Sequence, residues 1–284
     1  MYDWVADERI PPRAAAGHLM ADATTATDVQ TAQTSRKPTI VVLTTGTRHA
    51  AGILDALAER GIRPNLVILE RPHGRQLLTR ISDMRRRRGI SATVGAIGRR
   101  LLGAVRPTSA PWRSAEFYAQ RADHLLPVNS LVGDEVVNIL RDVQPDLLVL
   151  GGAPILPAAV LDLPRIGTLN AHPGLLPRYR GVDVVAHAIL NGDPVGATVH
   201  FVDAGIDTGR VVSQVEVPPA RPDSLPSLQE RVETAGAIAL AEAVERLLTD
   251  GSLPAESQAG RYPICRHLTQ AQRREAEARL RDGR

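Results

Sequence analysis

From residue 39 onward, the pattern of apolar and polar positions predicts strands and helices that alternate along the chain. Residues 39–45 (TIVVLTT) form a continuous β-branched run, which is typical of a strand buried on both faces of a sheet. In residues 51–60 the apolar positions share one helical face, and Gly61 ends the predicted helix. A second apolar run follows at residues 65–69. A strand, a helix and a strand joined by short turns form the βαβ unit of a parallel sheet.

The same alternation continues toward the C-terminus. Further strands are expected at residues 124–128, 146–150, 167–170, 196–202 and 209–217, and helices at residues 131–143, 158–161, 184–190 and 227–248, with a charged helical stretch at 269–281. The predicted fold class is therefore α/β: a Rossmann-like, mostly parallel twisted sheet with helices on both faces.

The chain is predicted to have three parts. Residues 1–37 are rich in Ala, Thr, Asp and Arg without a steady apolar period, which indicates a flexible N-terminal extension. The main domain is expected at residues 38–250, interrupted at about 71–112 by an Arg-rich insertion that is helical or partly disordered. Residues 251–284 are expected to form a short, partly helical C-terminal tail.

Composition and charge narrow the class of protein. With 284 residues and 43% hydrophobic content, the chain can bury a full core, built mainly from aliphatic residues because only 3% are aromatic. Cys265 is the only cysteine, so a disulfide framework and a thiolate metal cluster are excluded. We find no secretory signal and no membrane-spanning stretch, and expect a cytoplasmic protein without a membrane partner.

The formal charge is +3, from 34 basic and 31 acidic residues. Much of the positive charge lies in one span, at Arg85, Arg86, Arg87, Arg88, Arg99, Arg100 and Arg106. Such a run is either a solvated face or a site for a phosphate or nucleotide partner.

Candidate chemistry begins in the segment LNAHPGLLPRYRG, residues 169–181. Asn170 and His172 stand two residues apart at a strand's end, so their side chains project to the same side, where open α/β sheets place their ligands. Asn offers an amide donor to a developing oxyanion, and His can accept and return a proton near neutral pH. The alternative for His172 is a histidine that only caps the loop.

A second polar segment, VHFVDAGIDTG at residues 199–209, runs from a strand into a glycine-flanked turn. The turn contains Asp203 and Asp207, and a carboxylate there could orient an imidazole. Simple turn chemistry is the alternative, because Asp beside Gly is favoured in turns for backbone reasons.

Together these motifs resemble the folate-dependent formyltransferase family, which includes methionyl-tRNA formyltransferase, glycinamide ribonucleotide formyltransferase and the sugar N-formyltransferases. The family pattern is Asn-x-His, then Leu-Leu-Pro-x-Tyr/Trp-Arg-Gly, then a distant Asp-x-Gly. The chain matches it at Asn170, His172, Leu175, Leu176, Pro177, Arg180, Gly181, Asp207 and Gly209. The resemblance covers roughly residues 39–248 and is densest at 145–209. It implies that Asn170, His172 and Asp207 are catalytic and that 10-formyltetrahydrofolate is the formyl donor.

The resemblance also implies where the folate binds. The family wraps the pteridine ring with the segment that corresponds here to Gly151, Gly152, Ala153, Pro154, Ile155 and Leu156. Small residues there would leave room for a flat ring, although a tight turn between strand and helix would also explain them. The turn of Asp203, Ala204, Gly205 and Ile206 is expected to close the same pocket.

On the acceptor side, the candidate substrate-binding residues are Arg180, Gly181 and His187. His187 stands on a predicted helix, where a structural role is the alternative. No metal is expected, because His172 and His200 lack close partners at ligand spacing. The turn after the first strand has neither a Gly-x-Gly-x-x-Gly motif nor a phosphate-binding loop, which argues against a nicotinamide cofactor.

The expected acceptor is the amine of a small molecule: an amino sugar, an amino acid, a peptide or a natural-product amine. In methionyl-tRNA formyltransferase a C-terminal β-barrel helps to hold the tRNA, and the residues after 248 are too few for one, so no tRNA-binding domain is expected. Two alternatives stay open: a formyltetrahydrofolate hydrolase, and a non-catalytic folate-binding or regulatory homologue. The sequence does not decide the oligomeric state, and a homodimer is one of the open alternatives.

Overall fold

The computed structural model describes residues 37–70 and 113–282. The predicted Arg-rich insertion and, apart from Lys37, the predicted N-terminal extension lie outside the described residues. Residues 37–284 form one unit, separate from residues 1–36.

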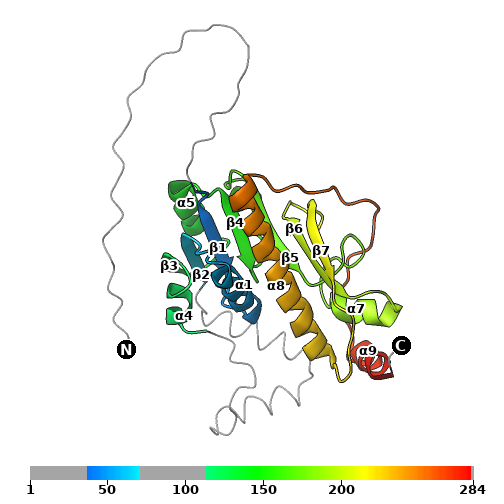
Figure 1. Cartoon of the computed structure of the whole chain (residues 1–284). Coiled ribbons are helices and arrows are strands. Elements are labelled where there is room, and N and C mark those ends of the chain that lie inside the picture. The colour runs from blue at the N-terminus through cyan, green and yellow to red at the C-terminus, as the bar shows by residue number, and fades with distance from the viewer. Residues whose placement is uncertain (1–36, 71–112, 283–284) are drawn as a thin grey trace, which may run out of the picture. The chain divides into compact units, whose positions relative to one another are not determined.

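The centre of this unit is a sheet with the strand order β3-β2-β1-β4-β5-β6-β7 (Figure 1). Its strands are β1 (Ile40–Thr44), β2 (Leu66–Glu70), β3 (His124–Val128), β4 (Leu147–Gly151), β5 (Gly167–His172), β6 (Gly196–Phe201) and β7 (Val211–Glu216). Strands β1 to β5 pair in parallel. At one edge of the sheet β6 pairs antiparallel with β5, and β7 pairs antiparallel with β6. The predicted mostly parallel Rossmann-like sheet is confirmed.

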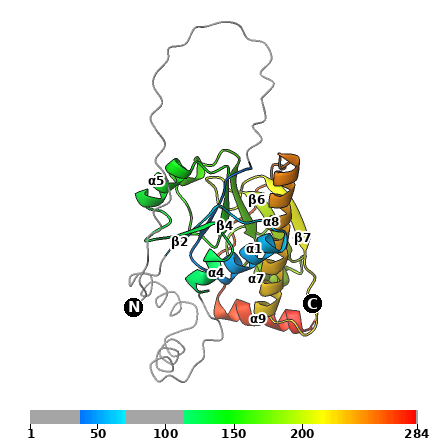
Figure 2. The same cartoon turned by 60° about the vertical axis from the view of Figure 1, so that its left-hand side comes forward.

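Helices cover both faces of the sheet, as predicted. Along β1, Val42 packs toward α1 (Arg48–Glu59) and α8 (Leu225–Asp250), while Val41 and Leu43 pack toward α5 (Asp134–Val143) and α6 (Ala158–Leu161). This alternation follows from the two-residue period of a strand. Figure 2 shows α1 and α8 together on their face of the sheet.

The long helix α8 crosses β5 and β6, the two strands that bear the predicted catalytic segment. Its start is fixed by a capping box, in which Ser224 and Ser227 bond each other's backbone amides, and its end by Gly251 in a left-handed conformation. At its midpoint Gly236 lies against the methyl groups of Ala171 and Ala197. The helix therefore lies close to the sheet beside the end of β5.

Two boundaries differ from the predicted ones in ways that affect the site. Strand β5 continues to His172, because residues 169–172 pair with β6, so Asn170 and His172 are both strand residues. Helix α1 begins at Arg48, where the Thr47 hydroxyl caps it by accepting from the amide of Ala50. That start places His49 in the first helical turn.

Three helices complete the described unit: α4 (Ala115–Ala119), which the sequence pattern did not predict, α7 (Val184–Asn191) and α9 (Gln270–Asp282). Helix α9 packs against α7. Between α8 and α9 the chain makes backbone bridges from Glu256 to Val211 and from Cys265 to Gly181. Within the described residues, no helix is both long and apolar enough to cross a membrane.

Candidate active site

The end of β5 and the start of the β6–β7 loop bring the predicted residues together. In the antiparallel pairing of β5 with β6, Asn170 stands directly opposite His200. The amide nitrogen of Asn170 lies 3.3 Å from Nε2 of His200. Asp207, on the loop after β6, places one carboxylate oxygen 3.8 Å from the same Nε2. Asn170 and Asp207 therefore both approach the same nitrogen of one imidazole.

His200 fixes the orientation of the Asn170 amide. Nδ1 of His200 lies 2.8 Å from the carbonyl oxygen of Phe201, which can only accept, so Nδ1 carries the proton. In the neutral ring Nε2 is then an acceptor, and the Asn170 NH2 group donates to it. Burial of the ring, which is 1% exposed, and the nearby His172 lower the pKa of His200, although Phe201, Asp207 and Asp203 act in the opposite direction. The neutral form that holds the amide in place is thus the favoured one.

His172 is held through Nε2 and turns Nδ1 toward Asp207. Nε2 lies 2.7 Å from the carbonyl oxygen of Tyr179 and donates to it. Nδ1 lies 3.6 Å from a carboxylate oxygen of Asp207, and a proton on Nδ1 would complete an ion pair. The ring is 4% exposed, so a charge on it would be screened weakly by solvent.

Asp207 is held in an unusual backbone conformation. Its φ angle is 53°, a left-handed value that non-glycine residues rarely adopt and that occurs often at functional sites. Its carboxylate accepts from the Gly181 amide at 2.8 Å, and its carbonyl accepts from the Gln258 side chain at 3.0 Å. The loop passes so close to β6 that a Cβ on Gly209 would lie 1.7 Å from the Phe201 carbonyl oxygen. The Asp-x-Gly motif is thus required by the backbone as well as by the carboxylate.

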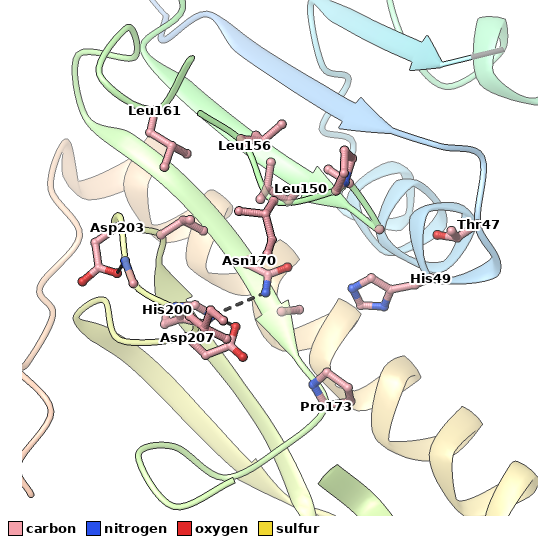
Figure 3. Close-up of a pocket in the computed structure, with 18 of the residues that line it drawn as sticks. Thr47, His49, Leu150, Leu156, Leu161, Asn170, Pro173, His200, Asp203 and Asp207 are labelled. Carbon is pink, nitrogen blue, oxygen red and sulfur yellow. Dashed lines mark hydrogen bonds and ion pairs between the residues drawn. The ribbon is translucent and has the colours of Figure 1, made fainter. Parts of the chain in front are cut away.

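A cavity of about 510 Å³ opens beside these residues (Figure 3), within the usual size range of small-molecule sites. Asn170, His200 and Asp207 line it, whereas His172 does not. One wall is largely apolar and comes from the segment after β4 together with the turn at 203–206. At the start of α1, Thr47 adjoins Gly152, while Arg48 and His49, with Glu233 of α8, form the wall on the other side of the cavity.

Most of the predicted folate-binding residues line this cavity: Gly152, Ala153, Pro154, Ile155, Leu156, Asp203, Ala204, Gly205 and Ile206. Ile155 is 82% exposed, an unusual position for a large apolar side chain. Gly151 does not line the cavity, and at Gly152 (φ 71°) a Cβ would lie 2.5 Å from the Thr47 hydroxyl. The tight turn against α1 therefore requires glycine at both positions, whether or not a flat ring binds beside Gly152.

The three predicted acceptor contacts lie elsewhere. Arg180 donates to the Ile206 carbonyl at 2.9 Å and the Gly181 amide donates to Asp207, so both hold the β6–β7 loop. His187 lies 2.9 Å from the Arg266 carbonyl and lines a different cavity, beside Tyr262. None of the three lines the cavity next to Asn170, so their contacts in the structure do not support a role in acceptor binding.

Sequence reasoning missed three residues of this site: His200, His49 and Glu233. The strand pattern did contain His200, but its position opposite Asn170 depends on the register between β5 and β6. The other two come from α1 and α8, which meet at the site only in the folded chain.

Sequence comparison relates the chain to formyltransferases. A profile of the formyl transferase family matches residues 92–244. The methionyl-tRNA formyltransferase of Burkholderia vietnamiensis (strain G4 / LMG 22486) is 32% identical over 228 residues, an overlap that covers 78% of this chain and 62% of that protein. The chain thus spans less than two thirds of the length of such relatives.

Solved structures show the same fold. Glycinamide ribonucleotide transformylase 1 from Symbiobacterium toebii aligns with a TM-score of 0.55 and 22% identity, covering 78% of this chain and 95% of that one. The N-formyltransferase from Helicobacter canadensis, solved in complex with folinic acid and dTDP-3-aminofucose, aligns with a TM-score of 0.52 and 16% identity, covering 80% and 71%.

The fold and the site define an α/β protein with a polar centre at the rim of a mostly parallel sheet. The family profile covers more than half of the sequence, and the chain belongs to the formyl transferase family. The resemblance predicted from its motifs is confirmed at this level.

Proposed function

We propose that the chain transfers the formyl group of 10-formyltetrahydrofolate to the amine of a small molecule. The observation that carries this proposal is the convergence of Asn170, His172 and Asp207 beside a cavity of about 510 Å³. The donor supplies an activated formyl group on N10 of the folate. The largely apolar wall around Pro154, Ile155 and Leu156 suits a flat heteroaromatic ring, with backbone amides of the 203–206 turn at its edge.

Asn170 is proposed to stabilise the formyl oxygen. As the amine nitrogen bonds to the formyl carbon, the carbonyl electron pair moves onto that oxygen, and a fixed donor there stabilises the charge. One amide hydrogen of Asn170 is donated to His200, and the second is free to point into the cavity. His172 does not line the cavity but lies next to Asp207, and a positive charge on its ring would further stabilise the negative charge on the formyl oxygen.

Asp207 is proposed to guide the proton. When the bond between the formyl carbon and N10 breaks, the amine has one proton to lose and N10 one to gain, so the transfer balances without another reactant. The Asp207 carboxylate lines the cavity and is held by Gly181, which places it to orient a water molecule that carries this proton.

The class of acceptor is also a proposal. Glu233 puts a half-buried carboxylate into the wall opposite the proposed folate wall, which favours a cationic amine and disfavours a polyanion close by. The Helicobacter canadensis protein was solved with an amino-sugar nucleotide, whereas the identity to methionyl-tRNA formyltransferases favours methionyl-tRNA as a second candidate.

The test is a formylation assay with 10-formyltetrahydrofolate and a panel of amino sugars, their nucleotide conjugates, amino acids, peptides and methionyl-tRNA. We expect amine-dependent turnover with a small molecule.

Asn170→Ala should lower kcat by about 10²–10³-fold, the usual cost of one preorganised donor. His172→Ala should abolish transfer and leave folate binding, followed by fluorescence, largely intact.

Other outcomes would replace this proposal. Formate release without any amine would indicate a hydrolase, and turnover with methionyl-tRNA alone would indicate a tRNA-modifying enzyme. Folate binding without either reaction would indicate a regulatory homologue, and unchanged turnover in His172→Ala would refute its assigned role.

A further inference from the structure

His49 has two buried ring nitrogens that the proposed reaction does not use. It stands in the first turn of α1, and within the part of the chain that the structure describes only the Ala171 carbonyl approaches the ring as an acceptor, too loosely for a well-formed hydrogen bond. Buried polar side-chain atoms nearly always have a partner, so an unpartnered imidazole requires an explanation. A ligand that supplies the partner is one explanation.

The ring points toward the reaction centre. Figure 3 shows His49 reaching from α1 into the cavity, on the side of Asn170 and Pro173. The carbonyl of Ala171 and the ring of His172 approach it from β5, and the carboxylate of Glu233 faces it from α8. His49 therefore lies on the wall opposite the proposed folate wall, where an acceptor would enter.

The other two histidines at the centre are already engaged. His172 donates through Nε2 to Tyr179 and turns Nδ1 toward Asp207. His200 uses Nδ1 for Phe201 and Nε2 for Asn170. Of the two described histidines that line this cavity, His200 has both nitrogens engaged, and His49 alone keeps a nitrogen lone pair that no other group occupies.

The reaction needs such a group. A primary aliphatic amine arrives mainly as an ammonium ion near neutral pH, like the side chain of lysine, and only the neutral amine can attack the formyl carbon. We propose that His49 accepts this first proton from the acceptor's ammonium and that Glu233 binds the ammonium beforehand and the imidazolium afterwards. The inference rests on the proposed function and adds the base that activates its nucleophile.

The balance of this step is simple. The N–H bond of the ammonium breaks, a proton bonds to a ring nitrogen of His49, and the amine keeps the electron pair. The imidazolium then releases the proton to water through a neighbouring cavity of about 180 Å³, which His49 and Glu233 also line. The second amine proton leaves later, by way of the water that Asp207 orients.

The electrostatic surroundings are compatible with this role. Burial lowers the pKa of His49, Glu233 and the Ala171 carbonyl raise it, and His172 lowers it again, so the free ring is neutral near neutral pH and has a lone pair for a proton. The charged or titratable groups around it are Arg48 and Asp55 on α1, Glu230 and Glu233 on α8, Arg113 before α4, and His200, Asp203 and Asp207 across the larger cavity. Arg48 pairs with Glu230 at 2.5 Å and Asp55 with Arg121 at 2.6 Å, which leaves Glu233 as the carboxylate that acts on the ring.

The kinetic test compares His49→Phe with wild type across pH. The variant keeps a ring of similar size but has no lone pair, and kcat/KM for the amine should fall by about 10²-fold at pH 7. The deficit should shrink as pH rises toward the amine's own pKa, because the amine then arrives neutral.

Glu233→Gln should raise KM for the amine more than it lowers kcat. His124→Gln, at an exposed position on β3, is the matched control and should be unchanged.

A deficit in kcat/KM of His49→Phe that is constant across pH, or no deficit, would overturn the proposal.

A second measurement does not depend on turnover. Titration of the isotope-labelled wild-type protein with simple primary amines should shift one imidazole NMR signal, which His49→Phe removes. A wild type that forms no formylated product but shows this shift would refute the proposed function and leave His49 as an amine-binding group; no shift would refute the role of His49 itself.

Discussion

The buried imidazoles of His49 and His200 tie the stability of the chain to pH. Burial lowers the pKa of both below the ordinary histidine value of 6.5. Between that value and the lower native pKa, the unfolded chain binds more protons than the folded one, so stability falls as pH falls through this window. We expect the thermal midpoint to drop between pH 7 and pH 5.

The measurement is a series of melting curves over that range. His49→Phe and His200→Gln should each flatten the dependence, whereas His124→Gln should not. A melting temperature that falls equally steeply in all three variants would show that other groups cause the acid sensitivity.

Individual residues could be predicted from the sequence only where a short motif contains the whole signal. Asn170 and His172 were identified because two strand residues in alternate positions face one side. The partner of Asn170 is His200, which stands 30 residues further along the chain, and only the pairing register brings the two together. Arg180 and Gly181 were assigned to the acceptor because they belong to the motif, but they hold the loop of Asp207 through backbone contacts that the motif does not reveal.

At the scale of elements, the segment between α8 and α9 supports the β6–β7 loop. The side chain of Gln258 donates to the carbonyls of Asp207, at 3.0 Å, and Gly209, at 2.7 Å. Gln258→Ala should reduce the free energy of unfolding by about 1–3 kcal/mol, from two lost hydrogen bonds. It should also lower kcat by about tenfold or more, because Asp207 is no longer held in its left-handed conformation.

Urea denaturation and the formylation assay measure the two effects separately. Gln272→Ala is the control, since its side chain bonds Thr269 at the start of α9, away from the site. Equal kcat values for wild type and Gln258→Ala would mean that the loop keeps its position without this side chain.

Strands and helices with a strong period were predicted within a few residues, and the misplaced boundaries have local causes. The predicted strand at 167–170 stops short because Ala171 and His172 precede a proline and read as loop, yet pairing with β6 extends β5 through them. The start of α1 was placed late because Arg48 and His49 are polar, although the Thr47 hydroxyl caps the helix at that point. Both shifts move candidate site residues from a predicted loop into regular structure.

For the whole molecule, the sheet was predictable because each βαβ unit is local in sequence and repeats along the chain. The C-terminal part was not. Residues 251–269 have no helical or strand period, and they are held by isolated bridges to Val211 and Gly181. Such contacts between distant segments leave no periodic pattern, so the sequence predicted a tail where the structure has a packed segment.

This packing gives a prediction for two truncations. Ending the chain at Gly251 removes the buried side chains of Leu253, Leu268 and Leu280 together with Gln258. Each buried leucine contributes about 1.5–3 kcal/mol, against a typical total stability of about 5–15 kcal/mol. This truncation should lose cooperative unfolding and all formyl transfer.

Removal of residues 1–36 should leave the melting temperature unchanged, because residues 37–284 form a separate unit. If both truncations melted like the full chain, residues 252–284 would be dispensable for folding, and the hydrogen bonds from Gln258 to the β6–β7 loop would contribute nothing to stability.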